Sequence, residues 1–288
     1  MKIKLTLGLC CATLVLSAQT KLPSIDTFPQ KKDIYKKGWI DFNKNGKKDI
    51  YEDPTQDVEK RLDDLISQMT LEEKAGQLVT YYGFNKVLED SVPTLAWKQT
   101  ALHNGVANID EHLNGEIYDL KRLVACMHET QRFFVEYTRL GIPVDFSNEG
   151  IRGLCAPKAT SFPSMNGLGC TWDKELAYLQ GEIEGKEARV LGYTNVYAPI
   201  LDVARDQRWG RWEGSIGEDP YLEARLGVEM AKGIQSQKVV STQNIMSDTA
   251  IAKVAGNGVS VPTHTSLLQK CITSMSTLSA RYSRKPEH

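Results

Sequence analysis

Asn195-Val196-Tyr197-Ala198-Pro199-Ile200 is a short apolar run with a helical pattern on each side of it in the sequence. An amphipathic stretch at residues 174–191 precedes the run and stops at Gly192. A second amphipathic stretch, residues 220–234, follows the run. Ile142-Pro143-Val144-Asp145-Phe146 reads as an earlier buried strand. Strands that alternate with helices in this way predict an α/β fold with a parallel sheet, open or closed into a barrel.

Polar segments follow the two predicted strands, at residues 148–152 and 202–213. In a (β/α)8 barrel the chemistry takes place on the loops after the strands, so both segments are candidates for a functional site. Glu149, beside a glycine at the end of the earlier strand, is a candidate ligand clamp.

The later segment holds Arg208, Arg211 and Glu213 together with two tryptophans. This composition suits a sugar site, because indole rings stack on sugar faces while guanidinium and carboxylate groups bind hydroxyls with fixed geometry. The alternative is a surface network of ion pairs at the start of the helix that begins at Pro220. Chemistry alone does not favour one of the two interpretations.

Residues 41–52 have oxygen-bearing side chains at positions one, three, five, nine and twelve, with Gly46 at position six. This is the spacing of an EF-hand calcium loop, in which the glycine allows a tight turn and the last glutamate closes the site with two oxygens. An Asx-rich turn without a cation is the alternative, since the loop carries three lysines and no helix precedes it. By position, the candidate calcium ligands are Asp41, Asn43, Asn45, Lys47, Asp49 and Glu52.

Residues 1–18 have the order of a secretory signal peptide: a positive start, an apolar run and small residues before cleavage after Ala18. The run is shorter than the roughly 20 residues that span a bilayer, and no later segment could serve as a membrane anchor. A buried N-terminal helix is the alternative, and the apolar stretch before Cys10 and Cys11 is too short to favour a lipoprotein. We expect a secreted or periplasmic protein, with a leader over residues 19–56 that is extended to about residue 40.

The charges are almost balanced, with 35 Lys and Arg against 36 Asp and Glu, so we expect no nucleic-acid partner. After signal cleavage, Cys126, Cys155, Cys170 and Cys271 remain, and their spacing forms neither a disulfide framework nor a metal cluster. Buried free thiols are the expected state.

Several motifs in order resemble glycoside hydrolase family 3 over residues 57–241. Met69-Thr70-Leu71-Glu72-Glu73-Lys74 looks like part of the opening helix pair of the family, with Thr70 as a helix N-cap. The motifs that follow it are Asn148-Glu149-Gly150, Ala159-Thr160-Ser161-Phe162-Pro163, residues 197–211 and Gly217-Glu218-Asp219-Pro220. The calcium-type loop also looks like that of certain bacterial members.

The resemblance implies an exo-acting, retaining β-glycosidase of the β-glucosidase or β-xylosidase type, on a (β/α)8-like first domain and without a cofactor in catalysis. An aspartate would act as nucleophile and a second carboxylate as acid and then base. Glu149 would grip hydroxyls of the terminal sugar, and Arg211 would contact the same sugar. Gly214 stands where many members carry a glutamate, with Glu213 one residue earlier, which leaves one sugar contact without its residue.

The family continues with a lysine-histidine pair and later a serine-aspartate nucleophile segment, and neither appears here. Back-translation of residues 242–248 with a shift of two nucleotides permits Pro-Lys-His-Tyr-Val-Arg-Tyr, which resembles the lysine-histidine segment. The composition also changes after Val240, so residues 242–288 read as out-of-frame translation or as a flexible tail. We therefore expect a barrel that is incomplete on its C-terminal side, an unstable chain and almost no hydrolysis. The alternatives are a non-catalytic carbohydrate-binding protein and a structural calcium-loop module.

Overall fold

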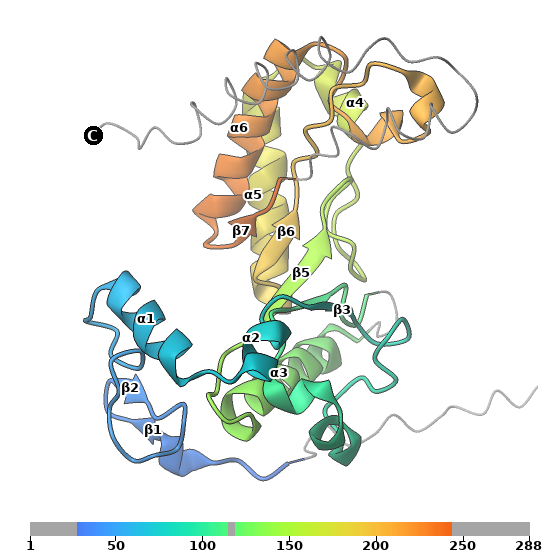
Figure 1. Cartoon of the computed structure of the whole chain (residues 1–288). Coiled ribbons are helices and arrows are strands. Elements are labelled where there is room, and N and C mark those ends of the chain that lie inside the picture. Colours follow the sequence, from blue (N-terminus) through green and yellow to red (C-terminus); the bar gives the residue numbers. More distant parts are fainter. Residues whose placement is uncertain (1–27, 115–118, 244–288) are drawn as a thin grey trace, which may run out of the picture.

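The structure is a computed structural model that describes residues 28–114 and 119–243. A five-stranded parallel sheet with strand order β3-β4-β5-β6-β7 occupies its centre (Figure 1). The predicted α/β fold with a parallel sheet is confirmed, whereas closure of the sheet into a barrel stays a prediction. The strands are β3 (Thr80–Tyr82), β4 (Asn108–Asp110), β5 (Asp145–Glu149), β6 (Asn195–Tyr197) and β7 (Val240–Ser241).

Helices connect the strands, and a small antiparallel hairpin of β1 (Tyr35–Lys36) and β2 (Trp39–Ile40) precedes them. The helix predicted over residues 174–191 is confirmed, and Gly192 ends it in the left-handed conformation (φ 97°) that favours glycine. Thr70 forms the expected N-cap, in a capping box with Glu73. The helices are α1 (Val58–Gln68), α2 (Leu71–Gly76), α3 (Leu120–Tyr137), α4 (Met165–Gly169), α5 (Lys174–Leu191) and α6 (Pro220–Ser236).

The strand predicted at residues 142–146 begins and ends three residues later, as β5. The register explains the shift, because Asp145 pairs with Asn108 and Ser147 pairs with Asp110 of β4. Glu149 is therefore the last residue of a paired strand rather than part of a loop. Its backbone position is fixed by the sheet.

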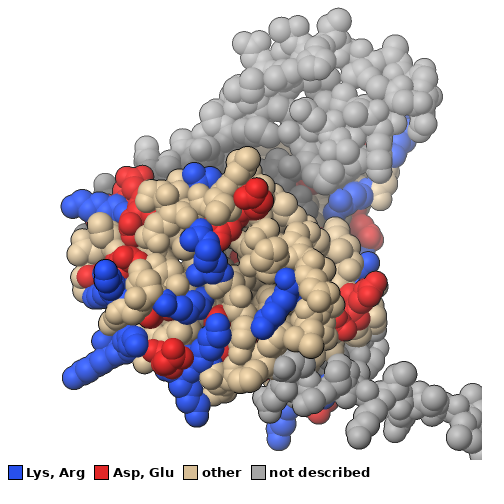
Figure 2. Space-filling model, turned by 60° about the horizontal axis from the view of Figure 1, so that its bottom comes forward, with Lys and Arg blue, Asp and Glu red and all other residues tan. Residues whose placement is uncertain are grey.

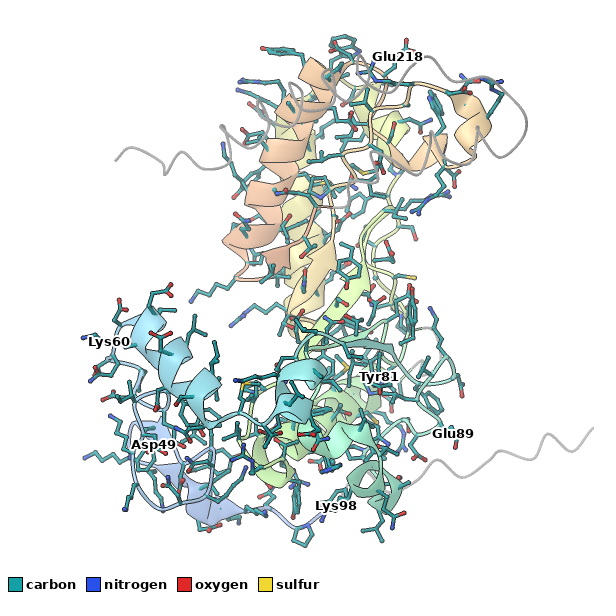
Figure 3. All side chains as sticks on the ribbon, in the orientation of Figure 1. Asp49, Lys60, Tyr81, Glu89, Lys98 and Glu218 are labelled. Carbon is teal, nitrogen blue, oxygen red and sulfur yellow. The ribbon has the colours of Figure 1, made fainter. Side chains whose placement is uncertain are left out.

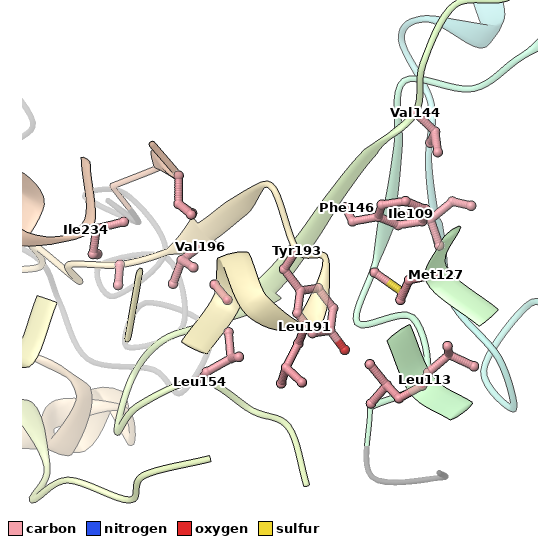
Figure 4. Packing of buried hydrophobic residues seen from close by; sticks show 14 of the residues in the cluster. Ile109, Leu113, Met127, Val144, Phe146, Leu154, Leu191, Tyr193, Val196 and Ile234 are labelled. Carbon is pink, nitrogen blue, oxygen red and sulfur yellow. The ribbon is translucent and has the colours of Figure 1, made fainter. Parts of the chain in front are cut away.

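The two faces of the sheet differ in polarity because side chains alternate along a strand. Ile109, Phe146 and Val196 point to one face and are almost completely buried in the same core as Met127 of α3 and Ile234 of α6 (Figure 4). Each such side chain contributes about 1.5–3 kcal/mol to the stability through burial. The opposite face carries polar residues.

Phe28 packs against α3 rather than belonging to an extended leader. Its ring centroid lies 5.6 Å from that of Phe133 and 4.8 Å from that of Tyr137. The guanidinium of Arg132, itself buried, donates a hydrogen bond of 2.8 Å to the carbonyl of Phe28 and another of 2.9 Å to Glu136. The prediction of an extended chain up to residue 40 is therefore wrong for residues 28–40.

Helix α1 is amphipathic, but none of its residues is buried. Its apolar side chains, with Val58 and Leu62 among them, line a groove of about 270 Å³ together with Phe42, Tyr51 and Leu140. Figure 3 shows α1, marked by Lys60, above the loop that contains Asp49. The N-terminal region therefore presents apolar surface.

Three of the cysteines lie in the described part of the chain, and all three are free thiols. Cys126 is buried as expected, but Cys155 and Cys170 are exposed, so the prediction of buried thiols is wrong for these two. Within the described residues, no helix combines the length and apolarity needed to cross a membrane. Basic and acidic side chains are interspersed on the face shown in Figure 2.

Some predictions fall outside the described residues. These are the signal peptide of residues 1–18, the start of the leader up to residue 27, Cys271 and the segment 244–288. Thr242, at the predicted start of the altered tail, is described and extends the sheet, because its backbone N–H donates to the Val196 carbonyl at 2.9 Å. At least this residue continues the fold.

Helices α5 and α6 lie side by side and touch through glycines (Figure 1). A Cβ on Gly181 would lie 2.1 Å from the carbonyl oxygen of Met230, and one on Gly233 would lie 2.2 Å from that of Tyr178. Carbon and oxygen atoms cannot approach so closely without a shift of the backbone. Glycine at these positions therefore sets the distance between the two helices.

We expect Gly181→Ala to destabilise the protein by about 1–3 kcal/mol, because the added methyl group must push α6 away. Gly217→Ala is the matched control, since a Cβ there would meet no atom within 4 Å. Urea unfolding of the full chain followed by circular dichroism measures both variants. Equal stability of Gly181→Ala and the unchanged chain would contradict the close contact.

Candidate functional site

The polar face of the sheet brings together side chains from three neighbouring strands. Asp110 of β4 pairs in register with Ser147 of β5, and Glu149 pairs with Tyr197 of β6. The Ser147 hydroxyl lies 2.7 Å from Asp110 Oδ1 and 2.9 Å from Asn108 Oδ1. Because the carboxyl ends of parallel strands share one edge of a sheet, these groups form a single polar surface there.

Glu149 is half-buried and is the centre of this surface. Its Oε2 atom is buried and has no hydrogen-bond partner among the described residues. Burial raises the pKa of Glu149, the charge of Asp110 raises it further, and the charges of Arg211 and Lys86 act in the opposite direction. The structure thus brings Glu149 and Arg211, both predicted site residues, into one electrostatic environment.

Arg208 and Glu213, also predicted site residues, are engaged elsewhere. The guanidinium of Arg208 binds both carboxylate oxygens of Asp206, at 3.0 Å and 2.6 Å, on the exposed surface. Glu213 forms an exposed ion pair of 2.7 Å with Arg152. The alternative of a surface ion-pair network therefore describes Arg208, while the Arg152–Glu213 pair links the loop after β5 to the loop after β6.

Sequence reasoning missed Asp110, Ser147 and Lys86, which all belong to this surface. One pattern in the sequence could have indicated Ser147. Asp145, Ser147 and Glu149 alternate along the strand with Phe146 between the first two, and this alternation marks a polar strand face. Strand β4 has only three residues and Lys86 lies in a loop, so neither carries a pattern of its own.

A buried glutamate on a helix lies beneath the loop that follows Glu149. Glu184 of α5 is fully buried, and a Cβ on Gly150 would lie 3.3 Å from its Oε2 atom. Burial raises the pKa of Glu184 to about 8, although the amide of Gln180 and the backbone of Gly153 stabilise the charged form in part. Glu184 is therefore protonated at neutral pH and packs as a neutral group.

The loop of residues 41–52 is held by its own carboxylates. Asp41 accepts a hydrogen bond of 2.9 Å from the backbone N–H of Gly46, and Glu52 accepts one of 2.6 Å from that of Phe42. Both carboxylates are buried, and their other oxygens accept hydrogen bonds of 3.1 Å from the backbone N–H groups of Asn45 and Asp49. The turn predicted from the glycine at position six is confirmed, since Gly46 has φ 79°.

The other predicted ligands bind one another. Asp49 accepts hydrogen bonds from the side-chain amides of Asn43 and Asn45, at 2.5 Å and 2.7 Å, and Lys47 is exposed. In the part of the chain that the structure describes, no three His, Cys, Asp or Glu side chains are close enough to hold a metal ion. The amide oxygens of Asn43 and Asn45 accept hydrogen bonds from the backbone N–H groups of Asn45 and Lys47, at 3.1 Å and 2.7 Å.

Lys44 forms its hydrogen bonds outside this loop, although its charge interacts with those of Asp41 and Glu52. Its Nζ atom donates to the carbonyls of Val135 and Thr138 at 2.8 Å and 2.6 Å, at the C-terminal end of α3. Burial lowers the pKa of Lys44 to about 8. Lys48 likewise pairs with Asp53 at 2.8 Å, outside the turn. Two of the three lysines thus bind groups other than the candidate ligands.

Comparison with known proteins decides the family. A model of the Glycosyl hydrolase family 3 N terminal domain matches residues 70–245, more than half of the chain. The chain belongs to glycosyl hydrolase family 3. A periplasmic beta-glucosidase/beta-xylosidase of Dickeya chrysanthemi is 30% identical over 227 residues, which cover 70% of this chain and 33% of the relative. A beta-xylosidase of Formosa agariphila is 42% identical over 103 residues, 34% of this chain and 14% of the relative.

Solved structures of two beta-glucosidases share the fold. A variant beta-glucosidase of Listeria innocua in complex with laminaribiose has a TM-score of 0.51 at 32% identity, over 62% of this chain and 24% of that one. A beta-glucosidase of Erythrobacter marinus has a TM-score of 0.60 at 24% identity, over 69% and 27% of the two chains. This family 3 chain spans about a third or less of the length of these relatives.

Membership in this family gives the chain the TIM-barrel-like α/β fold of the family's N-terminal domain. The predicted family is confirmed. The family 3 motif of Asn148-Glu149-Gly150 lies at the end of β5, and the motif that ends at Arg211 lies in the loop after β6, as the order of the motifs predicted.

We expect the stability of the family 3 domain to fall as the pH rises from about 4.5 to about 8. Over this range native Glu184 keeps its proton, whereas the unfolded chain loses it, so unfolding releases a proton. Glu184→Gln imitates the protonated form and should remove this part of the decrease, on the order of a few kcal/mol between the two pH values. Thermal unfolding of both proteins at pH 5 and pH 8 measures the difference. An identical pH dependence in the two proteins would show that Glu184 is charged in the fold.

Proposed function

We propose that the protein is an exported, exo-acting β-glycosidase that retains anomeric configuration and removes terminal glucose or xylose from glycans. The observation that carries the proposal is the buried Oε2 atom of Glu149, which has no protein partner in the described residues and stands at the carboxyl edge of the sheet beside Arg211. A sugar hydroxyl would supply the missing hydrogen bond. Relatives named as beta-glucosidase and beta-xylosidase support the choice of sugars.

The proposed binding mode follows from the charges of these groups. A carboxylate has two acceptor oxygens, so Glu149 would accept hydrogen bonds from two hydroxyls of one sugar ring. Arg211 would donate to an oxygen of the same ring from the loop after β6. The Arg152–Glu213 ion pair would keep the two loops at a constant distance while the sugar binds.

Retaining hydrolysis requires a nucleophilic carboxylate and an acid/base carboxylate about 5–5.5 Å apart. We assign neither role to a residue of this chain, and we propose that the chain lacks the nucleophile. We also propose that its sheet is part of a (β/α)8 barrel. The alternative function is a non-catalytic carbohydrate-binding protein. The same Glu149 and Arg211 would serve it, and a chain without the nucleophile would bind sugars in either case.

We further propose a secreted or periplasmic location, which the names of two periplasmic relatives support. A structural Ca²⁺ in the loop of residues 41–52 is proposed as well. The buried carboxylates of Asp41 and Glu52 would be its anionic ligands. The ion would take no part in hydrolysis and would hold the segment between β2 and α1.

Glu149→Gln should weaken the binding of glucose and xylose at least about tenfold, since a charge-assisted hydrogen bond contributes about 1.5–3 kcal/mol. Saturation-transfer NMR titration of the full chain measures this. Glu59→Gln is the control, because Glu59 is an exposed carboxylate on α1. Hydrolysis of aryl β-glucosides and β-xylosides is measured in parallel. If the unchanged chain binds neither sugar, the proposed site is wrong. If the unchanged chain hydrolyses the glycosides, the proposal that it lacks the nucleophile is wrong.

Addition of Ca²⁺ should raise the melting temperature of the full chain, because a ligand that binds only the folded state stabilises it. Glu52→Gln should abolish the increase, as it removes one oxygen charge from the last loop position. Mg²⁺, which prefers a smaller octahedral site, should have a weaker effect. An equal increase in Glu52→Gln and the unchanged chain would locate the ion elsewhere.

A further inference from the structure

The end of β3 is held tightly against the end of β4. The backbone N–H of Gly83 donates to the Asp110 carbonyl at 2.8 Å, and a Cβ on Gly83 would lie 2.3 Å from His112 Cα. Phe84 adds a hydrogen bond of 3.3 Å from its backbone N–H to His112 Nδ1. Only glycine allows this approach, so the loop that starts at Gly83 is kept at the carboxyl edge of the sheet.

Lys86 extends from this loop over the polar surface. Its ammonium group lies 5.1 Å from the centre of the Tyr82 ring and pairs with the carboxylate of Glu111. The Lys86 side chain keeps 47% of its surface exposed, while that of Glu111 keeps 13%. Lys86 is thus anchored at one side and open to solvent at the other.

Lys86 also acts on the two carboxylates beneath it. Its positive charge opposes the increase in pKa that burial causes at Asp110 and at Glu149. The strand order places β3 and β4 on one side of β5 and β6 on the other. The loop after β3, which carries Lys86, therefore lies on the β4 side of Glu149, and Arg211 comes from the loop after β6.

Asp110 completes the arrangement from below. It is buried and lies close to the Ser147 hydroxyl, but that hydroxyl has a single proton to share between Asp110 and Asn108. Burial raises the pKa of Asp110, and the Ser147 hydrogen bond and then the charge of Lys86 act in the opposite direction. Lys86 therefore adds to the stabilisation of a charged Asp110.

We propose that Lys86 is a second cationic sugar-binding residue, on the opposite side of Glu149 from Arg211, held in place by Glu111 and Asp110. Its ligand would be a terminal pyranose with free hydroxyls on adjacent carbons, one bound by Glu149 and the next by Lys86. The inference rests on the proposed sugar site and adds to it the wall formed by the loop after β3. Lys86 would donate hydrogen bonds to sugar oxygens, while Asp110 and Glu111 are positioning residues.

Titration of the full chain with glucose and with xylose, followed by saturation-transfer NMR, tests this role. Lys86→Gln should weaken binding about tenfold, which corresponds to the loss of one charge-assisted hydrogen bond. Lys86→Arg keeps the charge and the donors and should restore affinity to within about threefold of the unchanged chain. Lys60→Gln, an exposed lysine on α1 (Figure 3), is the matched control and should change nothing.

The outcomes separate this inference from the function on which it rests. If the unchanged chain binds neither sugar, both are wrong. If it binds them and Lys86→Gln binds equally well, the role of Lys86 alone is wrong. Glu111→Gln removes the anchor without touching Lys86, so it should weaken binding less than Lys86→Gln does. If Lys86→Arg binds as weakly as Lys86→Gln, the proposal is also wrong, because a cation that donates hydrogen bonds would then be insufficient at this position.

Discussion

Parallel pairing of β4, β5 and β6 is the interaction on which the other features depend. It fixes which residues share a face, because a shift of one residue would turn Phe146 toward the polar face and Ser147 toward the helices. It also brings the ends of three strands to one edge, where Asp110 and Glu149 meet. The loops after β3 and β6 then add Lys86 and Arg211, so the charges of three other segments act on Glu149.

The helices behind the sheet determine how firmly this surface is supported. Gly181 and Gly233 allow α5 and α6 to touch along their backbones, and the apolar strand face packs on the layer that the helices form. Glu184 places a carboxyl group in that layer, beneath the loop after Glu149, where burial keeps it protonated at neutral pH. Glu223 of α6 is a second such group, since burial and the charge of Asp202 raise its pKa to about 8. Each of these carboxyl groups lies behind one of the two site loops, so the loops rest on neutral polar groups rather than on charges.

The N-terminal segment is attached to the same framework through α3. The buried guanidinium of Arg132 binds the Phe28 carbonyl and the carboxylate of Glu136, while Lys44 binds carbonyls at the end of the helix. The calcium-type loop is therefore anchored to the domain whether or not it binds a cation. This attachment was invisible in the sequence, because residues 28 and 132 are more than a hundred positions apart and neither has a local pattern that points to the other.

Local patterns in the sequence were sufficient for the helix of residues 174–191, the N-cap at Thr70, the parallel α/β class and the family. Each depends on neighbours within a few residues, or on motifs that the chain carries intact. The tertiary structure alone decided the ends of β5, the surface position of Arg208 and the place of Lys86 and Asp110 beside Glu149. These depend on strand register and on contacts between segments far apart in the chain, and a short strand such as β4 has too few residues to show periodicity. Hydrogen bonding between strands, rather than local preference, assigns such residues to the site.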